Sequence, residues 1–436
     1  MNHRSKYCFA QALSAATCAL LGNESAVAQT EAGWQTDAAI LIYSEKGRVN
    51  VLEPTMIARK EVADDEFVSV QLVYDSLSGA TPTGAAPAST RQTFTTPSCG
   101  GSYSAEAYSQ PKRSFSDLRG ALNLSWDKPI SRMLRTQWGA HISGESDYAS
   151  LGVTGGALLD VNNKNTTLNL SFGFDGDHVA PASGKPVALT SINSCGGAGG
   201  GEEEEEEDDN ESIFQAFSGY QADKQVSSAL VGVTQLLSPE ALVQLNYSYT
   251  NAKGYLSDPY KIISVVSDNG EPLRVLYESR PDNHTWHSIF TKVAWGFAQD
   301  TLQASFRYFW DDWDISSKTL DFSYQFIINE RFYIRPYLRH YDQTAAKFYR
   351  HSIRQTEAQS IRHVSADQRL GAFTGRTLGL RAGYGIGGNN EVYLRIARYT
   401  QNGDKHPADA IGNQQDFDMF PNLNATYTQL GINYQF

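Results

Sequence analysis

Residues 428–436 read TQLGINYQF, and this closing stretch decides which fold the whole chain is expected to adopt. Counting back from the last residue, apolar side chains stand at Leu430, Ile432, Tyr434 and Phe436, with small or polar residues between them. A period of two that separates an apolar face from a polar face is typical of a β-strand. The chain therefore ends on a strand whose two faces meet different surroundings.

The same alternation recurs along the chain. In RGALNLSWD (residues 119–127), Leu122, Leu124 and Trp126 share one face, while Asn123 and Ser125 share the other. The stretches TTLNLSFGFDG (166–176) and TLQASFRYFW (301–310) repeat this pattern. A soluble β-sandwich also alternates, so periodicity alone leaves the class of all-β fold open.

The lengths of the connections separate the two folds. Short turns such as WDKPIS, LSPEA, FAQDT, INERF and GIGGNNE alternate with long polar loops at roughly 79–112, 178–223, 256–283, 345–371 and 402–423. Outer-membrane barrels show this asymmetry. The sequence therefore predicts an all-β fold, a transmembrane antiparallel β-barrel of about 16 strands with short periplasmic turns and long extracellular loops. Pro54, inside the second strand, predicts a bulge or an irregular stretch there.

The amino terminus is typical of an export signal. Arg4 and Lys6 precede an apolar stretch, and Ala26-Val27-Ala28 fits cleavage after Ala28. Residues 1–28 are therefore expected to be a signal peptide and residues 29–436 the barrel. No uninterrupted apolar run of about 18 residues follows, so membrane helices are not expected. The predicted location is the cell outer membrane.

Charge and cysteine content narrow the partners. A formal net charge of -12 argues against nucleic acid as a partner. Beyond the signal only Cys99 and Cys195 remain, each in a Ser-Cys-Gly-Gly motif within a long loop. In an oxidising compartment they form either a disulfide or two unpaired thiols. No cysteine or histidine stands at ligand spacing beside them, so zinc is not expected.

The carboxy-terminal pattern resembles the signal by which Gram-negative outer-membrane barrels are recognised for assembly. Its apolar positions are Leu430, Ile432, Tyr434 and Phe436. The resemblance implies the barrel-assembly machinery as a partner and a terminal aromatic at the periplasmic interface. The alternative is that Phe436 merely caps a soluble sheet.

Four further stretches point to one family: VLEPTMIARKE, VYDSLSGATPTGAAP, DYASLGV and NNKNTTLNLSFGF. They resemble an uncharacterised family of bacterial outer-membrane proteins that is known chiefly as a domain of unknown function. The resemblance covers most of the mature chain and implies a barrel in the outer membrane. It implies no activity and no catalytic residues.

A period of two also produces a basic stripe on one predicted strand. In RFYIRPYLRHYD (331–342), the polar face carries Arg331, Arg335 and Arg339, each followed by a tyrosine two positions on. Neighbouring strands add Arg307, Arg381 and Arg395 to the stripe. Lining the lumen, these arginines could attract or steer anions. Alternatively, they pair with Asp311 and Asp321 and brace the wall.

An acidic loop is the most unusual segment. The stretch CGGAGGGEEEEEEDDNE carries eight consecutive acidic residues, which are Glu202, Glu203, Glu204, Glu205, Glu206, Glu207, Asp208 and Asp209. Such a run repels itself, so loop 196–212 is expected to be disordered and extracellular. It either collects hard cations such as Ca²⁺, or bridges them to lipopolysaccharide phosphates, or is simply a solvated loop. No other cofactor is expected.

One acidic and aromatic segment, FWDDWDISS (309–317), raises the question of catalysis. Asp311 and Asp312 could form an active site with His340 and Asp342 if the four side chains met. Alternation places His340 on the lipid-facing register, which argues against an enzyme. Trp310 and Trp313 are expected to be interface anchors.

Two functions remain open from the sequence. The first is a pore or transport component for small or charged solutes. The second is a non-enzymatic surface, binding or assembly barrel that holds a cation, a lipid or a protein partner, including a sheathed electron-transfer partner. What fills the lumen would separate them.

Overall fold

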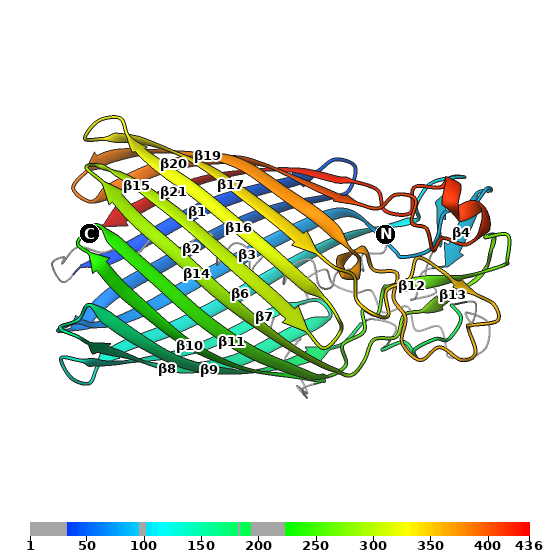
Figure 1. The fold of residues 1–436 in the computed structure, drawn as a ribbon, viewed down its shortest axis with the longest axis horizontal. Helices are drawn as coiled ribbons and strands as arrows, with labels where there is room; N and C mark the ends of the chain where they lie inside the picture. Colours follow the sequence, from blue (N-terminus) through cyan, green and yellow to red (C-terminus); the bar gives the residue numbers. More distant parts are fainter. Residues whose placement is uncertain (1–32, 96–101, 182–183, 193–222) are drawn as a thin grey trace, which may run out of the picture.

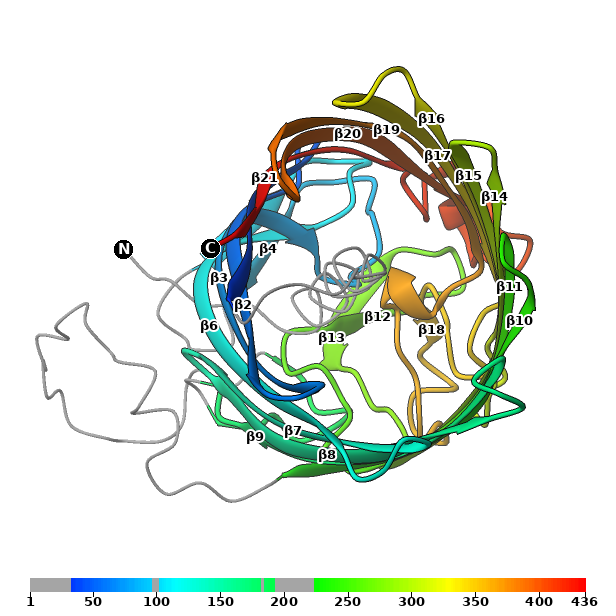
Figure 2. The same ribbon diagram turned by 90° about the vertical axis from the view of Figure 1, so that its left-hand side faces the viewer.

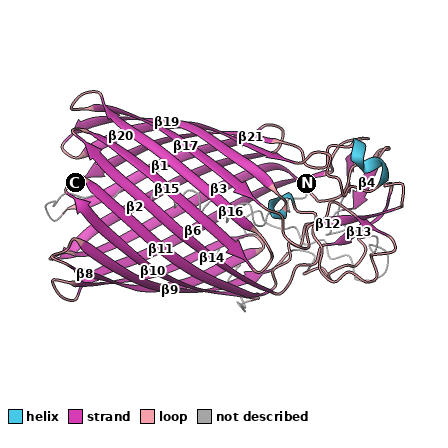
Figure 3. Cartoon of the chain, in the orientation of Figure 1, coloured by secondary structure: helices cyan, strands magenta, loops and turns pink. Residues whose placement is uncertain are grey.

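The computed structural model describes residues 33–95, 102–181, 184–192 and 223–436. These residues form a long closed barrel with a smaller body at one end (Figure 1; Figure 3). Among them, no helix is long and apolar enough to cross a membrane.

The barrel has sixteen antiparallel strands in the described part of the chain, in sequence order around the wall. They are β1 (Trp34–Glu45), β2 (Val49–Ala63), β3 (Glu66–Pro82), β6 (Lys112–Pro129), β7 (Leu134–Glu145), β8 (Tyr148–Val161), β9 (Thr166–Val179), β10 (Lys224–Ser238), β11 (Ala241–Gly254), β14 (Asn283–Phe297), β15 (Asp300–Asp311), β16 (Ser316–Ile327), β17 (Phe332–Gln343), β19 (Phe373–Gly387), β20 (Asn390–Gly403) and β21 (Leu423–Gln435). The first and last strands close the barrel, pairing from Gln35 with Gln435 to Glu45 with Ala425. The predicted fold class is confirmed.

The outward face of the strands is apolar because the alternation seen in the sequence continues around the wall. Ile40 on β1 is 49% exposed, Phe172 on β9 is 57% exposed and Leu378 on β19 is 65% exposed. Aliphatic and aromatic side chains occupy equivalent positions on the other strands. A continuous exposed apolar belt of this kind suits contact with lipid.

The two ends of the barrel differ in their connections. At the turn end, connections 64–65, 130–133, 162–165, 239–240, 298–299, 328–331 and 388–389 are all short. At the loop end lie the five long connections, 83–111, 180–223, 255–282, 344–372 and 404–422. Three short connections share that end, 46–48, 146–147 and 312–315. The predicted sorting of long loops to one end is confirmed.

The irregularity predicted at Pro54 takes a mild form. The pairing of β2 with β3 is interrupted between Leu52 and Thr55, yet the register is the same on both sides of the gap. Pro54 pairs with Ile40 of β1 on its other edge. A proline has no N–H to donate, and the ladder lacks the pairs of Glu53 and Pro54 instead of forming a bulge.

The described parts of the long loops fold together into a cap over the loop end. It contains β4 (Gln92–Thr95), β5 (Ser102–Ala105), β12 (Ile262–Val266), β13 (Pro272–Tyr277), β18 (Ile353–Arg354), η2 (Gln368–Leu370) and η3 (Gly412–Asp416). The cap stands beyond the strand ends in Figure 1, and the view along the barrel in Figure 2 shows β12, β13 and β18 across the lumen. The lumen is therefore covered at its loop end.

The cap has its own apolar core. Ile263 and Val265 of β12 pack against Leu276, Ile353 and Val364, and all five are buried. Three different segments contribute to this cluster, because β18 pairs in parallel with β12 although about 90 residues separate them in the chain. The cluster fixes loop 255–282 against loop 344–372.

Candidate functional site

Two opposite walls of the lumen carry different side chains. We define the arginine wall as the inward faces of β17, β19, β20 and β21, and the hydroxyl wall as the inward faces of β6–β10. Figure 2 shows the two walls facing each other across the barrel. Both faces follow from the strand register, because residues that pair across strands point to the same side of the sheet.

The arginine wall places three arginines in one row. Arg335 of β17 pairs directly with Arg381 of β19, and Arg381 pairs directly with Arg395 of β20. Like charges directly opposite each other on neighbouring strands destabilise a sheet. A row of three therefore needs local compensation, and this concentration of charge at one level of the lumen makes it the candidate site.

Tyrosines lie on both sides of this arginine row. Toward the turn end, the next inward row contains Tyr333 and Tyr393, and toward the loop end it contains Tyr337 and Tyr427. The Arg381 guanidinium lies 3.9 Å from the centroid of the Tyr393 ring. Aromatic faces attract guanidinium groups, so the rings hold the cations in place.

Glycines make room for these rings. Gly383 lies between Tyr333 and Tyr393, and a Cβ atom there would stand 2.2 Å from the Tyr333 ring. A Cβ atom at Gly431 would stand 2.3 Å from the Tyr393 ring. The two rings therefore lie flat against the wall only because these positions have no side chain.

The three guanidinium groups contact different side chains. Arg381 Nη2 lies 2.8 Å from Glu391 Oε1, an acceptor that also receives the Tyr333 hydroxyl at 2.7 Å. Arg335 Nε donates to the neutral Gln325 at 2.9 Å. Arg395 lies 5.2 Å from the centroid of the Tyr337 ring and makes no ion pair in the described part of the chain. Among the described residues, Arg395 thus keeps its positive charge without an acidic partner.

The other predicted stripe residues lie in three different settings. Arg339 pairs with Asp321 at 2.6 Å, while Arg307 points into the lumen and lies 5.4 Å from the centroid of the Phe290 ring. Arg331 is exposed in the turn 328–331 and lies outside the strand, at the turn end of the barrel. The stripe in the wall therefore contains five of the six predicted arginines.

The proposed bracing carboxylates also differ from each other. Asp321 accepts from Arg339 and from the Tyr337 hydroxyl at 2.9 Å. Asp311 instead lies 2.8 Å from His284 and accepts the amide of Ile315 at 2.7 Å. One carboxylate braces the arginine stripe, and the other shapes the β15–β16 connection.

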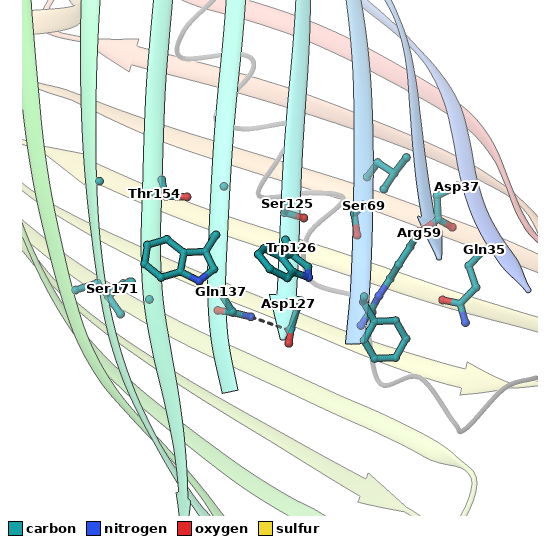
Figure 4. Close-up of a pocket in the computed structure, with 18 of the residues that line it drawn as sticks. Gln35, Asp37, Arg59, Ser69, Ser125, Trp126, Asp127, Gln137, Thr154 and Ser171 are labelled. Carbon is teal, nitrogen blue, oxygen red and sulfur yellow. Dashed lines mark hydrogen bonds between the residues drawn. The ribbon is translucent and has the colours of Figure 1, made fainter. Parts of the chain in front are cut away.

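The hydroxyl wall is hollow. Its inward positions carry Ser125, Thr154, Ser171 and Ser228 together with glycines such as Gly173, all lining a cavity of about 950 Å³. Figure 4 shows this surface with Ser125, Thr154 and Ser171, and beyond them the charged side chains of Arg59, Asp37 and Asp127. Small hydroxyl side chains leave space for solute and offer hydrogen bonds to it.

A buried ionic clamp secures the cap. Arg280 Nε lies 2.6 Å from Glu278, Arg280 Nη2 lies 2.9 Å from Asp367, and Arg369 Nη2 lies 2.8 Å from Asp258. Burial raises the pKa of the Asp367 carboxyl. The nearby cations outweigh this effect and hold the pKa well below its usual range; they are Arg369, Lys261 and Arg280. The clamp joins loop 255–282 to loop 344–372, so these two loops should move as one body.

The residues considered for catalysis do not form one site. Asp311 faces inward and His340 faces outward, on the lipid side. The prediction that Trp313 is an interface anchor is wrong, because Trp313 is buried and stacks on His284 at 3.8 Å between ring centroids. Trp310 faces outward.

Several predicted features fall outside the described residues. They are the signal peptide 1–28, Cys99, Cys195 and the acidic run Glu202 to Asp209. Within the described ranges, no group of three or more metal-ligating side chains is present. The terminal pattern is described, and Leu430, Ile432, Tyr434 and Phe436 are all exposed on the outside of the barrel.

Sequence reasoning missed the partners of the arginines. Glu391, Gln325 and the glycines under the tyrosine rings gave no signal, because their contacts depend on which residues face each other across strands. Tyr333 and Tyr337 were visible in the alternation but were not assigned a role.

Comparison with solved structures finds large β-barrels at low identity. A bacterial polysaccharide outer-membrane secretin is 8% identical, with a TM-score of 0.44 over 93% of this chain and 100% of that chain. The outer-membrane protein OpdK of Pseudomonas aeruginosa is 8% identical, with a TM-score of 0.41 over 93% and 99%. The toluene transporter TodX of P. putida is 9% identical, with a TM-score of 0.39 over 93% and 91%.

No curated protein matches the chain. A family model described as a protein of unknown function (DUF3570) matches residues 10–436, nearly the whole sequence. The chain therefore belongs to the DUF3570 family.

Proposed function

We propose that this protein is an outer-membrane channel for small anionic solutes. The observation that carries the proposal is the inward row of Arg335, Arg381 and Arg395, which brings three guanidinium groups to one level of the lumen. A solute carboxylate or phosphate would accept charge-assisted hydrogen bonds from these guanidinium groups. The hollow hydroxyl wall opposite leaves room for the rest of the solute.

The location is part of the same proposal. The exposed apolar belt, the sorted loops and the terminal aromatic on the outside of the barrel suit a bacterial outer membrane. In this placement the turn end faces the periplasm and the cap faces the exterior. The barrel-assembly machinery and lipopolysaccharide would then be its partners.

The test is ion selectivity in planar bilayers. The refolded chain is expected to conduct and to prefer anions, as read from the reversal potential across a salt gradient. The double variant R335Q with R395Q removes two positive charges from the lumen. Its anion preference should therefore fall by roughly fivefold or more. The matched control is R274Q with R362Q, which removes two exposed charges from the cap surface. Equal selectivity in all three proteins would contradict the proposal.

A second candidate follows from the cap. Its apolar core and its buried ionic clamp could close the loop end of the barrel permanently. The protein would then be a non-enzymatic surface or binding barrel that holds a lipid, a cation or a protein partner. Absence of current at every voltage, from a correctly refolded chain, would favour this candidate over the channel.

A further inference from the structure

The outward face of the barrel carries a basic patch at one place near the loop end. Its members are Lys318 of β16, His340 of β17, Arg376 of β19 and Arg398 of β20. They face outward because each alternates along its own strand with residues that face the lumen, such as Arg339, Arg381 and Arg395. Lys318, Arg376 and Arg398 are exposed.

The four side chains are neighbours across adjacent strands. His340 pairs directly with Arg376 on one side and with Leu320 on the other. Lys318 lies two residues before Leu320 and is therefore diagonal to His340. Arg398 is diagonal to Arg376 because Arg398 pairs with Leu378. Diagonal neighbours in an antiparallel sheet lie about 7–8 Å apart, so long side chains converge on one ligand. We call this set the outer basic patch.

One acidic group shares this surface. Asp342 faces outward opposite Lys318, and its Oδ2 accepts a hydrogen bond from the Thr374 hydroxyl at 3.3 Å. No ion pair involves Lys318, Arg376 or Arg398 in the described part of the chain. Lys318, Arg376, Arg398 and the one carboxylate together leave net positive charge facing outward.

The patch lies where the apolar belt ends. One step closer to the barrel centre on the same strands are Leu320, Leu338, Leu378 and Ile396, each between 41% and 65% exposed. Each patch residue lies within five positions of the loop end of its strand. Cations at the edge of a lipid-facing belt meet the headgroup layer rather than the acyl chains.

This concentration of charge is confined to one sector. On β11, β14 and β15, the outward positions at the same end are mostly aromatic: Tyr247, Tyr249, His287 and Trp310, with the Tyr247 hydroxyl 2.8 Å from His287. These are ordinary interface aromatics. Lys253 is a single outward cation near the end of β11. The cluster of cations on β16–β20 is therefore a distinct feature of the outward face.

We propose that the outer basic patch binds the phosphate groups of the lipid A portion of lipopolysaccharide. The charge complementarity is direct, since arginine binds phosphate bidentately and lysine as a point charge. The hydrophobic side chains below the patch would contact the acyl chains of the same molecule. The proposal relies on the outer-membrane placement proposed above, but not on conduction.

The test is binding of lipid A to the refolded chain in detergent. Affinity is measured for lipid A with both phosphates and for lipid A with its phosphates removed. We expect the intact lipid to bind more tightly, and the variant R376Q with R398Q to weaken its binding by at least about tenfold. The matched control is K60Q with K128Q, two outward lysines beside Trp34 and Trp126 at the turn end, which should bind normally.

The outcomes separate the two proposals. Equal binding of both lipids, or an equal effect of both double variants, would overturn the lipid A site even if the channel conducts anions. Cell fractionation that places the chain outside the outer membrane would overturn the location, and with it the biological setting of the site. Weakened binding of intact lipid A by R376Q with R398Q alone would support the site whether or not the barrel conducts.

Discussion

The hydroxyl wall and the arginine wall both place glycines on their inward faces, but the glycines have opposite effects. On the hydroxyl wall, the atoms nearest to a Cβ built at Gly139 or Gly173 belong to the small side chains Thr154 and Ser228. Space remains above them, and the cavity forms there. On the arginine wall, Gly383 and Gly431 are covered by tyrosine rings.

This difference shows how a single residue type can either open or fill a lumen. A glycine opposite serine or threonine leaves a hollow, whereas a glycine opposite tyrosine lets a large ring lie flat. The flat rings then carry guanidinium groups at a fixed height above the wall. One wall supplies room, and the other supplies rigidly held positive charge.

The largest expected effect comes from filling a glycine under a ring. In G383A the new methyl group would displace the Tyr333 ring, so the barrel should lose about 1–3 kcal/mol of stability, as overpacked sites do. The measurement is the denaturant concentration at the midpoint of unfolding of the refolded barrel, with tryptophan fluorescence as the signal. The control is G385A in the same strand, where the nearest atom to a new Cβ is 3.7 Å away. Equal midpoints for both variants would mean that the ring is not held by the glycine.

Much of the barrel could be predicted from the sequence because side-chain alternation is local. The pattern in residues 119–127 and 428–436 needs only neighbours in the chain, and the structure confirms its apolar outward face. Loop length is local too, so the two ends were distinguishable. The five inward arginines on β15–β20 followed from the same period.

The arginine row itself required information that alternation does not contain. Whether Arg335 stands opposite Arg381 depends on register, and shifting one strand by two residues would keep every face but separate them. The cap was hidden for another reason. Its contacts join distant segments, such as Ser264 with the amide of Ala86, 178 positions apart. Ile262–Val266 is an apolar run within one of these loops, but its pattern does not show which distant segments it packs against.

A smaller effect should follow from removing the carboxylate that serves the arginine wall. In E391Q, Arg381 loses its ion pair while the Tyr333 hydroxyl keeps an acceptor. Because one negative charge is removed, the net charge of the lumen becomes more positive, and anion preference should rise. The two side chains of this pair are 13% and 23% exposed. Loss of the carboxylate should be worth about 1 kcal/mol, or roughly fivefold in the permeability ratio. The measurement is the reversal potential.

The control for E391Q is E330Q, which removes an exposed carboxylate from the turn 328–331 at the same end of the barrel. Its reversal potential should stay close to that of the wild type. If both variants raise anion preference equally, the charge of the turn end as a whole matters, and the arginine row has no special place in selectivity.

The smallest expected effect comes from placing an aromatic ring on the hydroxyl wall, as the arginine wall already has. Ser125 lines the cavity and pairs with Gly139, so S125W would lay a ring over a glycine as Tyr333 does on the arginine wall. Single-channel conductance should fall by about twofold because the cavity is partly filled, while selectivity should hold because no charge changes. L124W adds the same ring to the lipid face of the same strand and should conduct normally. Unchanged conductance in S125W would show that solute does not pass along the hydroxyl wall, and the route would then follow the arginine wall alone.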